Sequence, residues 1–288
     1  MLRGLYTAAS GMIAQQRRHD TVTNNIANLN TPGYKAMTAT IRSFPEMLVA
    51  AMGGSEQNRT SPVGKLTTGV FAEESRLNFT QGDLVQTNRA QDLALVSDLE
   101  VPGATFDESG KYVDEQGNVV YQPQVFFTVL APNGEQQYTR DGSFRTAADG
   151  TLITAEGDPV LGIDGQPIVI NDTWDNIAVL TDGTLYDKQL GQPIPGAQLM
   201  LTVIDNPNML IREGNKRFRY EGPPGGIRQV QPGDRVEIRQ GFLERSNADP
   251  TQSLVDLMSA LRLYEANQRV IQFYDDSLRL AANEIGKV

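Results

Sequence analysis

Residues 24–36 read NNIANLNTPGYKA and follow a stretch with good helix-forming composition. Asn is unfavourable inside a helix because its amide competes for nearby backbone groups. Pro32 keeps the preceding Thr31 out of the helical region, and Gly33 permits a positive φ angle. The stretch therefore predicts that a helix starting near the first residue ends at about Asn28.

An apolar seam runs along the segment before this stop. Its positions alternate spacings of three and four residues, which is the pattern of a helix that packs on a partner. The seam is apolar at its ends and polar in its middle. Its members are Leu2, Leu5, Ala9, Met12, Gln16, His19, Thr23 and Ile26.

The other end of the sequence predicts a second and longer helix. Asp249 offers an N-cap, Pro250 suits the first helical position, and Gln252 is placed for a capping box. A helix over 250–286 would be roughly 55 Å long at about 1.5 Å per residue, and such a helix with one apolar seam is rarely stable alone in water. The apolar seam positions are Leu254, Leu257, Leu261, Tyr264, Ile271, Leu278, Ala282 and Ile285.

The two seams lie at opposite ends of the chain, so the helices are expected to pair with each other or with copies of themselves. The predicted fold class is α+β: a mainly β central domain inserted between two long terminal α-helices that pair in a coiled-coil-like bundle. The expected domains are a discontinuous helical assembly domain (1–34 and 245–288), an extended connector (35–91) and a β domain (92–244).

Short strands with a period of two fill the predicted β domain. Asp-Gly and Asn-Gly pairs separate them and supply the positive φ angles that tight hairpin turns require. The clearest hairpin is AVLTDGTLYD at 178–187. The turn pairs are Asn133-Gly134, Asp141-Gly142, Asp149-Gly150, Asp164-Gly165 and Asp182-Gly183.

Composition restricts the function. The 288 residues are 39% hydrophobic and 21% charged, which is typical of an ordered chain. The net charge of −10 argues against binding to nucleic acid or to anionic lipid. The absence of cysteine excludes disulfides, thiolate catalysis and cysteine-based zinc sites. The first residues lack the apolar core of a signal peptide, so export by the general secretory route is not expected.

No catalytic, cofactor or metal site is predicted. The acidic residues of the β domain stand in turn dipeptides that need Asp or Gly for backbone reasons, and no calcium-loop pattern is complete. The single histidine, His19, has no Ser-His-Asp or metal-binding arrangement around it. Two alternatives remain open at this point: an envelope glycan-acting enzyme, and an adhesin or binding module with a coiled-coil stalk.

Both termini resemble one family. Residues 1–36, with their Asn-rich segment followed by T-P-G-Y-K, resemble the N-terminus of bacterial flagellar rod and hook proteins, and residues 241–270 resemble the C-terminal signature of the same family. FTQGDLVQTNRAQDLAL (79–95), YTRDGSF (138–144) and DGTLITAEGDPVLG (149–162) are similar to rod segments. The N-terminal motif residues are Asn24, Asn25, Asn28, Thr31, Pro32, Gly33 and Tyr34.

This resemblance implies a structural subunit of the basal-body rod, the torque-transmitting drive shaft of the bacterial flagellum. It implies export without a cleaved signal through the flagellar type III apparatus, and helical self-assembly with copies of the chain and with other rod and hook subunits. It implies no nucleic acid, small-molecule substrate, cofactor or enzymatic activity. The expected assembly interface consists of Leu2, Leu5, Ala9, Met12, Ile26, Leu254, Leu257, Leu261, Tyr264, Ile271, Leu278 and Ile285.

One segment departs from the family pattern. Residues 96–127, ending in Phe126-Phe127, stand where the family usually runs directly into a G-x-G-F-F strand. The proximal rod, the distal rod and a divergent Gram-positive rod paralogue therefore remain alternatives, and the role of the insert near 97–124 stays open.

Overall fold

The computed structural model describes residues 2–50, 62–99, 101, 103–107, 110–114, 116–214, 216–231 and 233–285. The chain forms two compact units. Unit 1 consists of Met1–Ala27, Met37–Arg76 and Asp249–Val288, and unit 2 of Asn28–Ala36 and Leu77–Ala248.

The elements of unit 1 are two long helices and short strands. They are α1 (Leu2–Ala27), β1 (Met37–Thr38), β2 (Ile41–Ser43), β3 (Met47–Ala50), β4 (Pro62–Leu66), β5 (Val70–Ala72), α2 (Pro250–Leu280) and the π-helical η4 (Ala281–Ile285). β6 (Arg76–Leu77) spans the sequence boundary between the units. β2 pairs with β5 and β3 pairs with β4, both antiparallel.

The elements of unit 2 are mostly strands. They are β7 (Leu84–Gln86), β8 (Leu93–Ser97), β9 (Lys111–Val113), β10 (Val119–Tyr121), β11 (Gln124–Leu130), β12 (Gln136–Thr139), β13 (Arg145–Thr146), β14 (Leu152–Ile153), η1 (Trp174–Asn176), β15 (Ile177–Val179), β16 (Thr184–Asp187), β17 (Gln192–Gln198), β18 (Leu201–Ile204), η2 (Pro207–Met209), β19 (Leu210–Glu213), β20 (Arg217–Tyr220), η3 (Pro224–Gly226), β21 (Ile227–Gln229), β22 (Val236–Gln240) and β23 (Phe242–Glu244).

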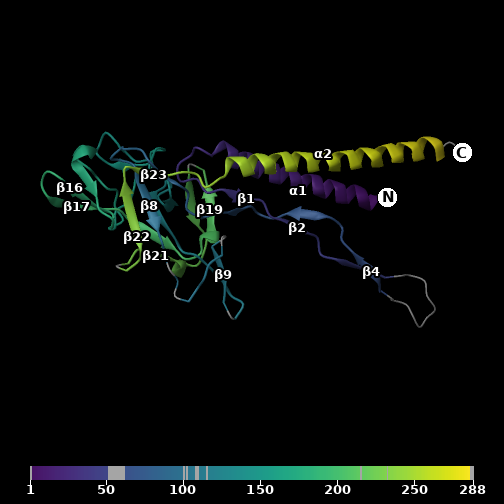
Figure 1. Ribbon diagram of the computed structural model, residues 1–288, viewed down its shortest axis with the longest axis horizontal. Coiled ribbons are helices and arrows are strands. Elements are labelled where there is room, and N and C mark those ends of the chain that lie inside the picture. Colours follow the sequence, from purple (N-terminus) through teal and green to yellow (C-terminus); the bar gives the residue numbers. More distant parts are fainter. Residues whose placement is uncertain are drawn as a thin grey trace. The chain divides into compact units, whose positions relative to one another are not determined.

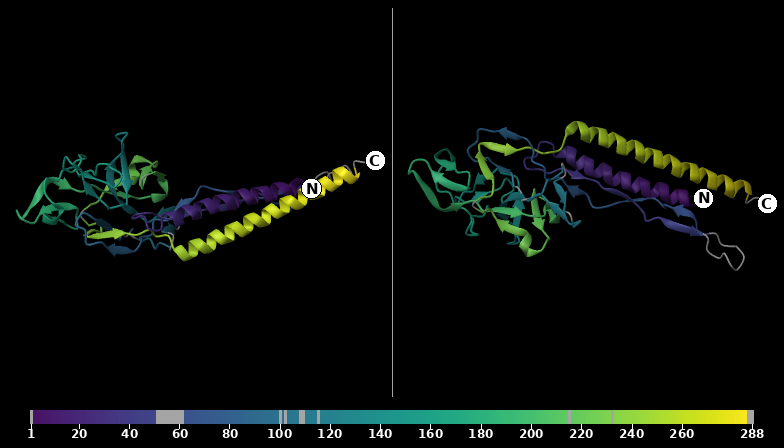
Figure 2. Two further views of the ribbon diagram at one scale, coloured as in Figure 1. Left: turned by 90° about the horizontal axis from the view of Figure 1, so that it is seen from above. Right: turned by 60° about the horizontal axis from the view of Figure 1, so that its bottom comes forward.

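The terminal helices lie side by side and run in opposite directions (Figures 1 and 2). The predicted fold class, a β-rich centre between two paired terminal helices, is confirmed. Asp249 caps α2 by accepting hydrogen bonds from the Thr251 and Gln252 backbone nitrogens at 2.7 and 3.1 Å. The Gln252 amide donates to Asp256 at 3.3 Å, so the expected capping box is replaced by a bond further along the helix. Within the described residues, neither helix has the sustained hydrophobicity of a bilayer-spanning segment.

The main sheet of unit 2 has the described strand order β19-β20-β12-β11-β18-β21. β11 lies inside it, with Phe127 opposite both Thr139 of β12 and Leu201 of β18. Phe126 and Phe127 are both fully buried, and they belong to different apolar clusters. Because successive side chains of a strand point to opposite faces, β11 supplies both cores of the unit.

Most of the predicted turns hold. Gly134, Gly150, Gly165 and Gly183 have φ angles between 76° and 87°, and β15 and β16 form the expected hairpin with Val179 opposite Leu185. Asp141-Gly142 differs, because Gly142 is not among the residues with positive φ. A side chain at Gly142 would overlap the Leu93 carbonyl, so the residue is small for packing. In the insert near 97–124, β9 and β10 form a hairpin.

Candidate assembly surface

The contact between α1 and α2 uses small and polar residues. A larger side chain at Gly4 would overlap the Tyr274 ring, and Gly11 lies against the Asn267 amide. Arg18 bonds Asp256 at 2.7 Å. Small side chains at a helix contact let the axes approach closely. Gly4 and Gly11 therefore leave room for the side chains of α2 that lie against them.

A second face of α1 is covered by a polar strap, the segment 68–75 together with Met37. Thr21 Oγ1 lies 3.0 Å from Ser75 Oγ, and Ser10 Oγ accepts a hydrogen bond from the Val70 nitrogen at 3.4 Å. The Asn25 amide exchanges two hydrogen bonds with the Met37 backbone, at 2.7 and 2.9 Å. These bonds account for the polar side chains of Ser10, Thr21 and Asn25 in α1.

The predicted interface residues are incompletely covered in the single chain. Leu5, Ala9, Met12, Ile26, Leu257, Tyr264 and Ile271 are half-buried. Leu254, Leu261 and Leu278 are exposed by 47%, 42% and 40%. Ala282 is exposed. The side chains of Leu2 and Ile285 lie outside the described part of the structure.

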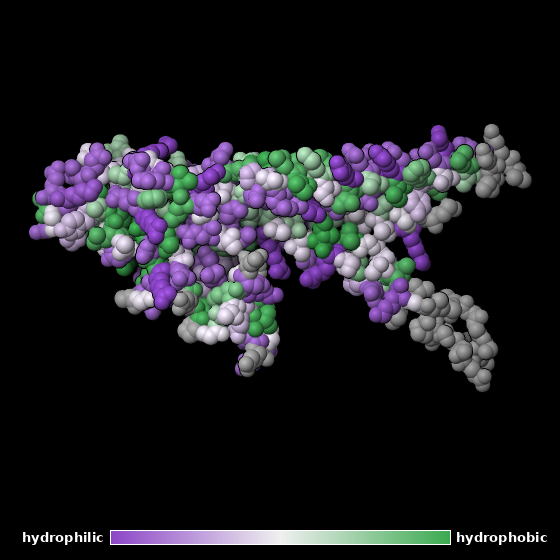
Figure 3. All heavy atoms as spheres, in the orientation of Figure 1, coloured by the Kyte–Doolittle hydropathy of each residue, from purple (hydrophilic) through white to green (hydrophobic). Residues whose placement is uncertain are grey.

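Two further apolar residues widen the exposed stripe on α2. Val255 and Met258 are each 57% exposed, and with Leu254 and Leu261 they occupy positions i, i+1, i+4 and i+7 of one face. We call these four residues the outer α2 patch. Figure 3 shows hydrophobic side chains gathered over the first half of α2. The sequence-based prediction missed Val255 and Met258, because it followed only positions spaced alternately by three and four residues. The signal that could have identified them is that both are apolar residues next to that seam.

The two units differ in charge. Unit 1 contains 11 Lys and Arg against 11 Asp and Glu, and unit 2 contains 14 against 24, so 14 − 24 accounts for the whole net charge of −10. Like-charged surfaces repel on association. The helical unit is therefore free of a net charge that would oppose packing against copies of itself.

The N-terminal motif residues that follow α1 are built into unit 2. The Gly33 nitrogen donates to the Glu244 carbonyl at 2.8 Å, and Gly33 has a φ of 67°. Tyr34 is 2% exposed and lies under the Arg212 guanidinium, 4.4 Å from its ring centroid. Thr31 bonds both the backbone and the side chain of Asn28, at 3.2 and 3.1 Å.

The remaining motif residues differ in their exposure. Pro32 is half-buried and Asn24 is exposed, whereas Asn25 is buried and bonds its own chain at Met37.

Directly after the motif, Lys35 enters a buried ion cluster. Lys35 Nζ donates to Glu244 Oε1 at 2.7 Å, and Arg140 Nε lies 3.2 Å from Glu244 Oε2; all three side chains are 1% exposed. Burial and the neighbouring Arg140 charge lower the pKa of Lys35 to about 8. Burial raises the pKa of Glu244, but the Arg140 and Lys35 charges outweigh that effect and hold it below its usual value. Two cations share one carboxylate here, and Lys is the one able to lose its proton.

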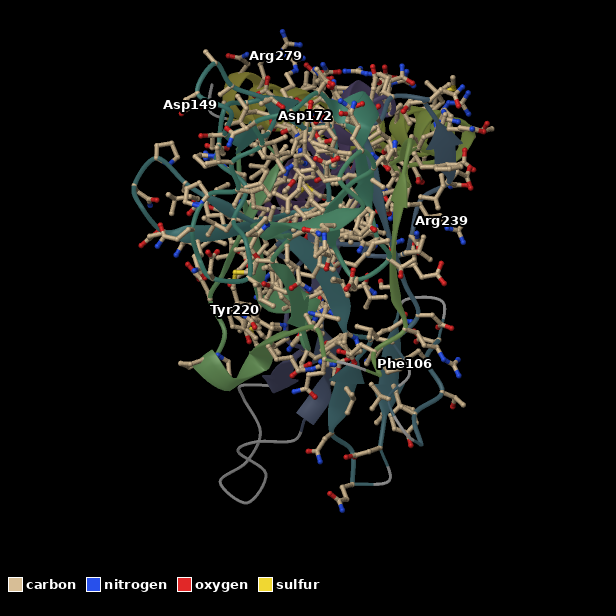
Figure 4. The ribbon with its side chains drawn as sticks, turned by 90° about the vertical axis from the view of Figure 1, so that its left-hand side faces the viewer. Phe106, Asp149, Asp172, Tyr220, Arg239 and Arg279 are labelled. Atoms are coloured by element: carbon tan, nitrogen blue, oxygen red, sulfur yellow. The ribbon has the colours of Figure 1, made fainter. Side chains whose placement is uncertain are left out.

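The acidic turn residues have backbone partners. Asp149, Asp164 and Asp182 accept hydrogen bonds from backbone nitrogens two residues ahead, at 3.0, 3.2 and 3.0 Å. Figure 4 shows Asp149 at the outer surface, pointing away from the strands. Among the residues that the structure describes, no three His, Asp or Glu side chains come together as metal ligands would. His19 lies 3.6 Å from the neighbouring Asp20 carboxylate.

Comparison with known proteins gives family matches at both ends and in the middle. Residues 5–35 match the family described as flagella basal body rod protein. Residues 122–186 match the flagellar hook protein FlgE/F/G D1 domain, and residues 239–284 match the flagellar basal body rod FlgEFG protein C-terminal family.

Full-length relatives agree with these matches. The chain is 35% identical over 291 residues to the flagellar hook-basal body complex protein FlhO of Bacillus subtilis, covering 100% of both chains. It is 29% identical to the flagellar basal-body rod protein FlgG of Borreliella burgdorferi, covering 98% of each chain. It is also 29% identical to the hook-basal body complex protein FlhP of B. subtilis, over 97% of this chain and 98% of that protein.

Proposed function

The chain belongs to the flagellar basal-body rod family, and on that premise we propose that it is a rod subunit which polymerises through the outer faces of its terminal helices and transmits torque. It is a structural component of the flagellar basal body and not an enzyme. The proposed partners are copies of this chain and other rod or hook subunits. We also propose that the chain is exported by the flagellar type III apparatus.

The main support for assembly through the helices is the exposed apolar surface of the outer α2 patch. Fully burying a Leu, Val or Met side chain contributes about 1.5–3 kcal/mol. The four patch residues are still 42–57% exposed, so about 3–6 kcal/mol of apolar burial remains for a neighbour. Association costs about 4–15 kcal/mol in lost freedom of motion. One such contact is therefore marginal, and several neighbours acting together are needed, as in a polymer.

The half-buried residues of α1 extend this surface. Leu5, Met12 and Ile26 belong to the apolar seam of α1 and are only half-buried in the single chain. A surface that does not close on itself when copies associate builds a helical filament rather than a ring. We therefore assign both seams to contacts between subunits.

Electron microscopy of purified basal bodies tests the rod assignment. A small tag placed at the exposed Asn133-Gly134 turn of unit 2 would mark the chain without touching either helix. We expect tag density on the rod and unchanged motility. Tag density confined to the hook, or absent from basal bodies of a motile strain, would contradict a rod position.

A further inference from the structure

The chain passes between the two units at four places, after Ala27, Ala36, Arg76 and Ala248. On the unit 2 side, these crossings belong to the segments 28–36, 77–83 and 244–248. The segments are far apart in the sequence, yet side-chain and backbone hydrogen bonds connect them inside unit 2. The N-terminal motif and the C-terminal motif meet at this point.

Asn247 bonds two of the other crossing segments at once. Its Oδ1 accepts from the Ala36 nitrogen at 2.7 Å. Its Nδ2 donates to the carbonyls of Asn78 and Thr80 at 2.9 and 3.0 Å. The Asn78 nitrogen in turn donates to the Ala36 carbonyl at 2.8 Å. One amide side chain therefore holds three crossings together.

Lys35 and Glu244 make a second set of links among the same segments. Lys35 Nζ donates to the Thr80 carbonyl at 2.9 Å as well as to Glu244. Glu244 Oε1 also accepts from the Gly82 nitrogen at 2.9 Å. The Glu244 carbonyl accepts from Gly33 at 2.8 Å, which secures the segment that follows α1.

Backbone packing leaves little space at this place. A side chain at Gly33 would overlap the backbone of Arg140 and Asp141, and one at Gly82 would overlap the Arg245 carbonyl. The Arg245 nitrogen donates to the Asp83 carbonyl at 2.8 Å. Segments that pack this closely and share hydrogen-bonding side chains are expected to unfold locally together, in a single cooperative opening.

We propose that Lys35, Glu244 and Asn247 hold the segments 28–36, 77–83 and 244–248 together inside unit 2. We call these three bonded segments the crossing joint, because all four passages of the chain between the units begin or end in them. Force entering from the terminal helices then reaches the β-strands through one tied group of segments instead of through separate flexible linkers. The mechanical role rests on the proposed function as a torque-transmitting subunit. The joint itself is a property of the single chain and can be measured there.

Native-state hydrogen exchange of the wild-type protein is the first test. The reporters are the backbone amides of Gly33, Ala36, Asn78, Gly82 and Arg245. We expect them to share one opening free energy and one dependence on denaturant, lower than those of the Leu130 amide in β11. Amides that open independently, each with its own denaturant dependence, would overturn the joint.

Variants provide the second test. Asn247→Ala should accelerate exchange at all reporter amides together, by roughly 10- to 100-fold, because it removes one partner from several hydrogen bonds. Asn133→Ala is the matched control, since that Asn also makes side-chain hydrogen bonds in unit 2 but lies in an exposed turn. Acceleration confined to Ala36 in Asn247→Ala would overturn the proposal. If Asn247→Ala also removes the exchange protection of the Leu130 amide, the variant has destabilised the whole of unit 2. The wild-type exchange experiment then tests the proposal by itself.

Swimming under load tests the mechanical role. We expect strains carrying Asn247→Ala to incorporate the subunit into basal bodies but to lose speed more steeply than the Asn133→Ala strain as medium viscosity rises. Equal curves for the two strains would refute the mechanical role while leaving the rod assignment intact. Failure of the rod assignment would appear differently, as absence of the wild-type chain from purified rods.

Discussion

Replacing Val255 and Met258 with Gln tests the outer α2 patch directly. Both side chains are 57% exposed in the single chain. The substitutions keep side chains that favour helices and that avoid a new charge. Their effect on the folded monomer should be small, because exposed substitutions outside special features change stability by about 0.5 kcal/mol or less.

The effect on assembly should be larger. Each residue retains 57% of its apolar surface for a neighbour, and full burial of such a side chain is worth about 1.5–3 kcal/mol. Losing this at two positions removes about 2–3 kcal/mol from each subunit contact. That loss corresponds to a roughly 30- to 160-fold weaker contact.

The assay compares the Val255→Gln/Met258→Gln chain with Arg262→Gln/Glu265→Gln. The control places two Gln residues on exposed positions of the same helix and leaves the net charge unchanged. Circular dichroism should show matching melting curves for both chains. Quantification in purified basal bodies should show depletion of the patch variant only. Equal incorporation of the two variants would show that the outer α2 patch does not contribute to assembly.

Three further predictions concern the rest of the chain. Deleting residues 270–288 should leave unit 2 folded, judged by hydrogen exchange in β11, but abolish assembly and motility; normal swimming by this truncation would contradict it. Phe127→Ala should reduce the free energy of unfolding by about 3–5 kcal/mol in a urea titration, because it opens a cavity in a fully buried core, and a loss below about 1 kcal/mol would contradict that burial. The lowered pKa of Lys35, about 8 against an ordinary 10.5, means that the unfolded chain binds this proton more tightly, so the contribution of Lys35 to the free energy of unfolding should rise between about pH 8 and pH 10.5. Lys35→Met should remove that rise, and an identical pH profile in the variant would disprove the cause.

Local patterns in the sequence predict the elements well. Spacings of three and four residues identify both helices, and Asp249 with Pro250 marks the start of α2 because capping involves only neighbouring residues. Asp-Gly and Asn-Gly pairs locate turns for the same reason. Gly142 departs from this rule because its small size serves contact with Leu93, a residue 49 positions away along the chain.

The helix faces are harder to predict from the sequence. A seam of large apolar residues predicts a partner for each helix, but it does not say whether that partner is the other helix or another molecule. In the structure, Gly4 and Gly11 of α1 lie close to Tyr274 and Asn267 of α2. The large side chains of the outer α2 patch are exposed.

The buried ion cluster could not be read from the sequence. Lys35 and Glu244 are 209 positions apart, and each stands in a short motif that has a local explanation as a turn or strand end. Only the folded unit brings them within 2.7 Å. The sequence shows only that each terminal motif contains a charged residue, Lys35 in one and Glu244 in the other. That these two residues form an ion pair depends on the tertiary structure.

A density map of the intact rod at side-chain resolution tests the central claim most directly. We expect the map to show Val255 and Met258 of each subunit covered by side chains of a neighbouring subunit. Finding both residues open to solvent in the assembled rod, with subunits held together through unit 2 alone, would contradict it.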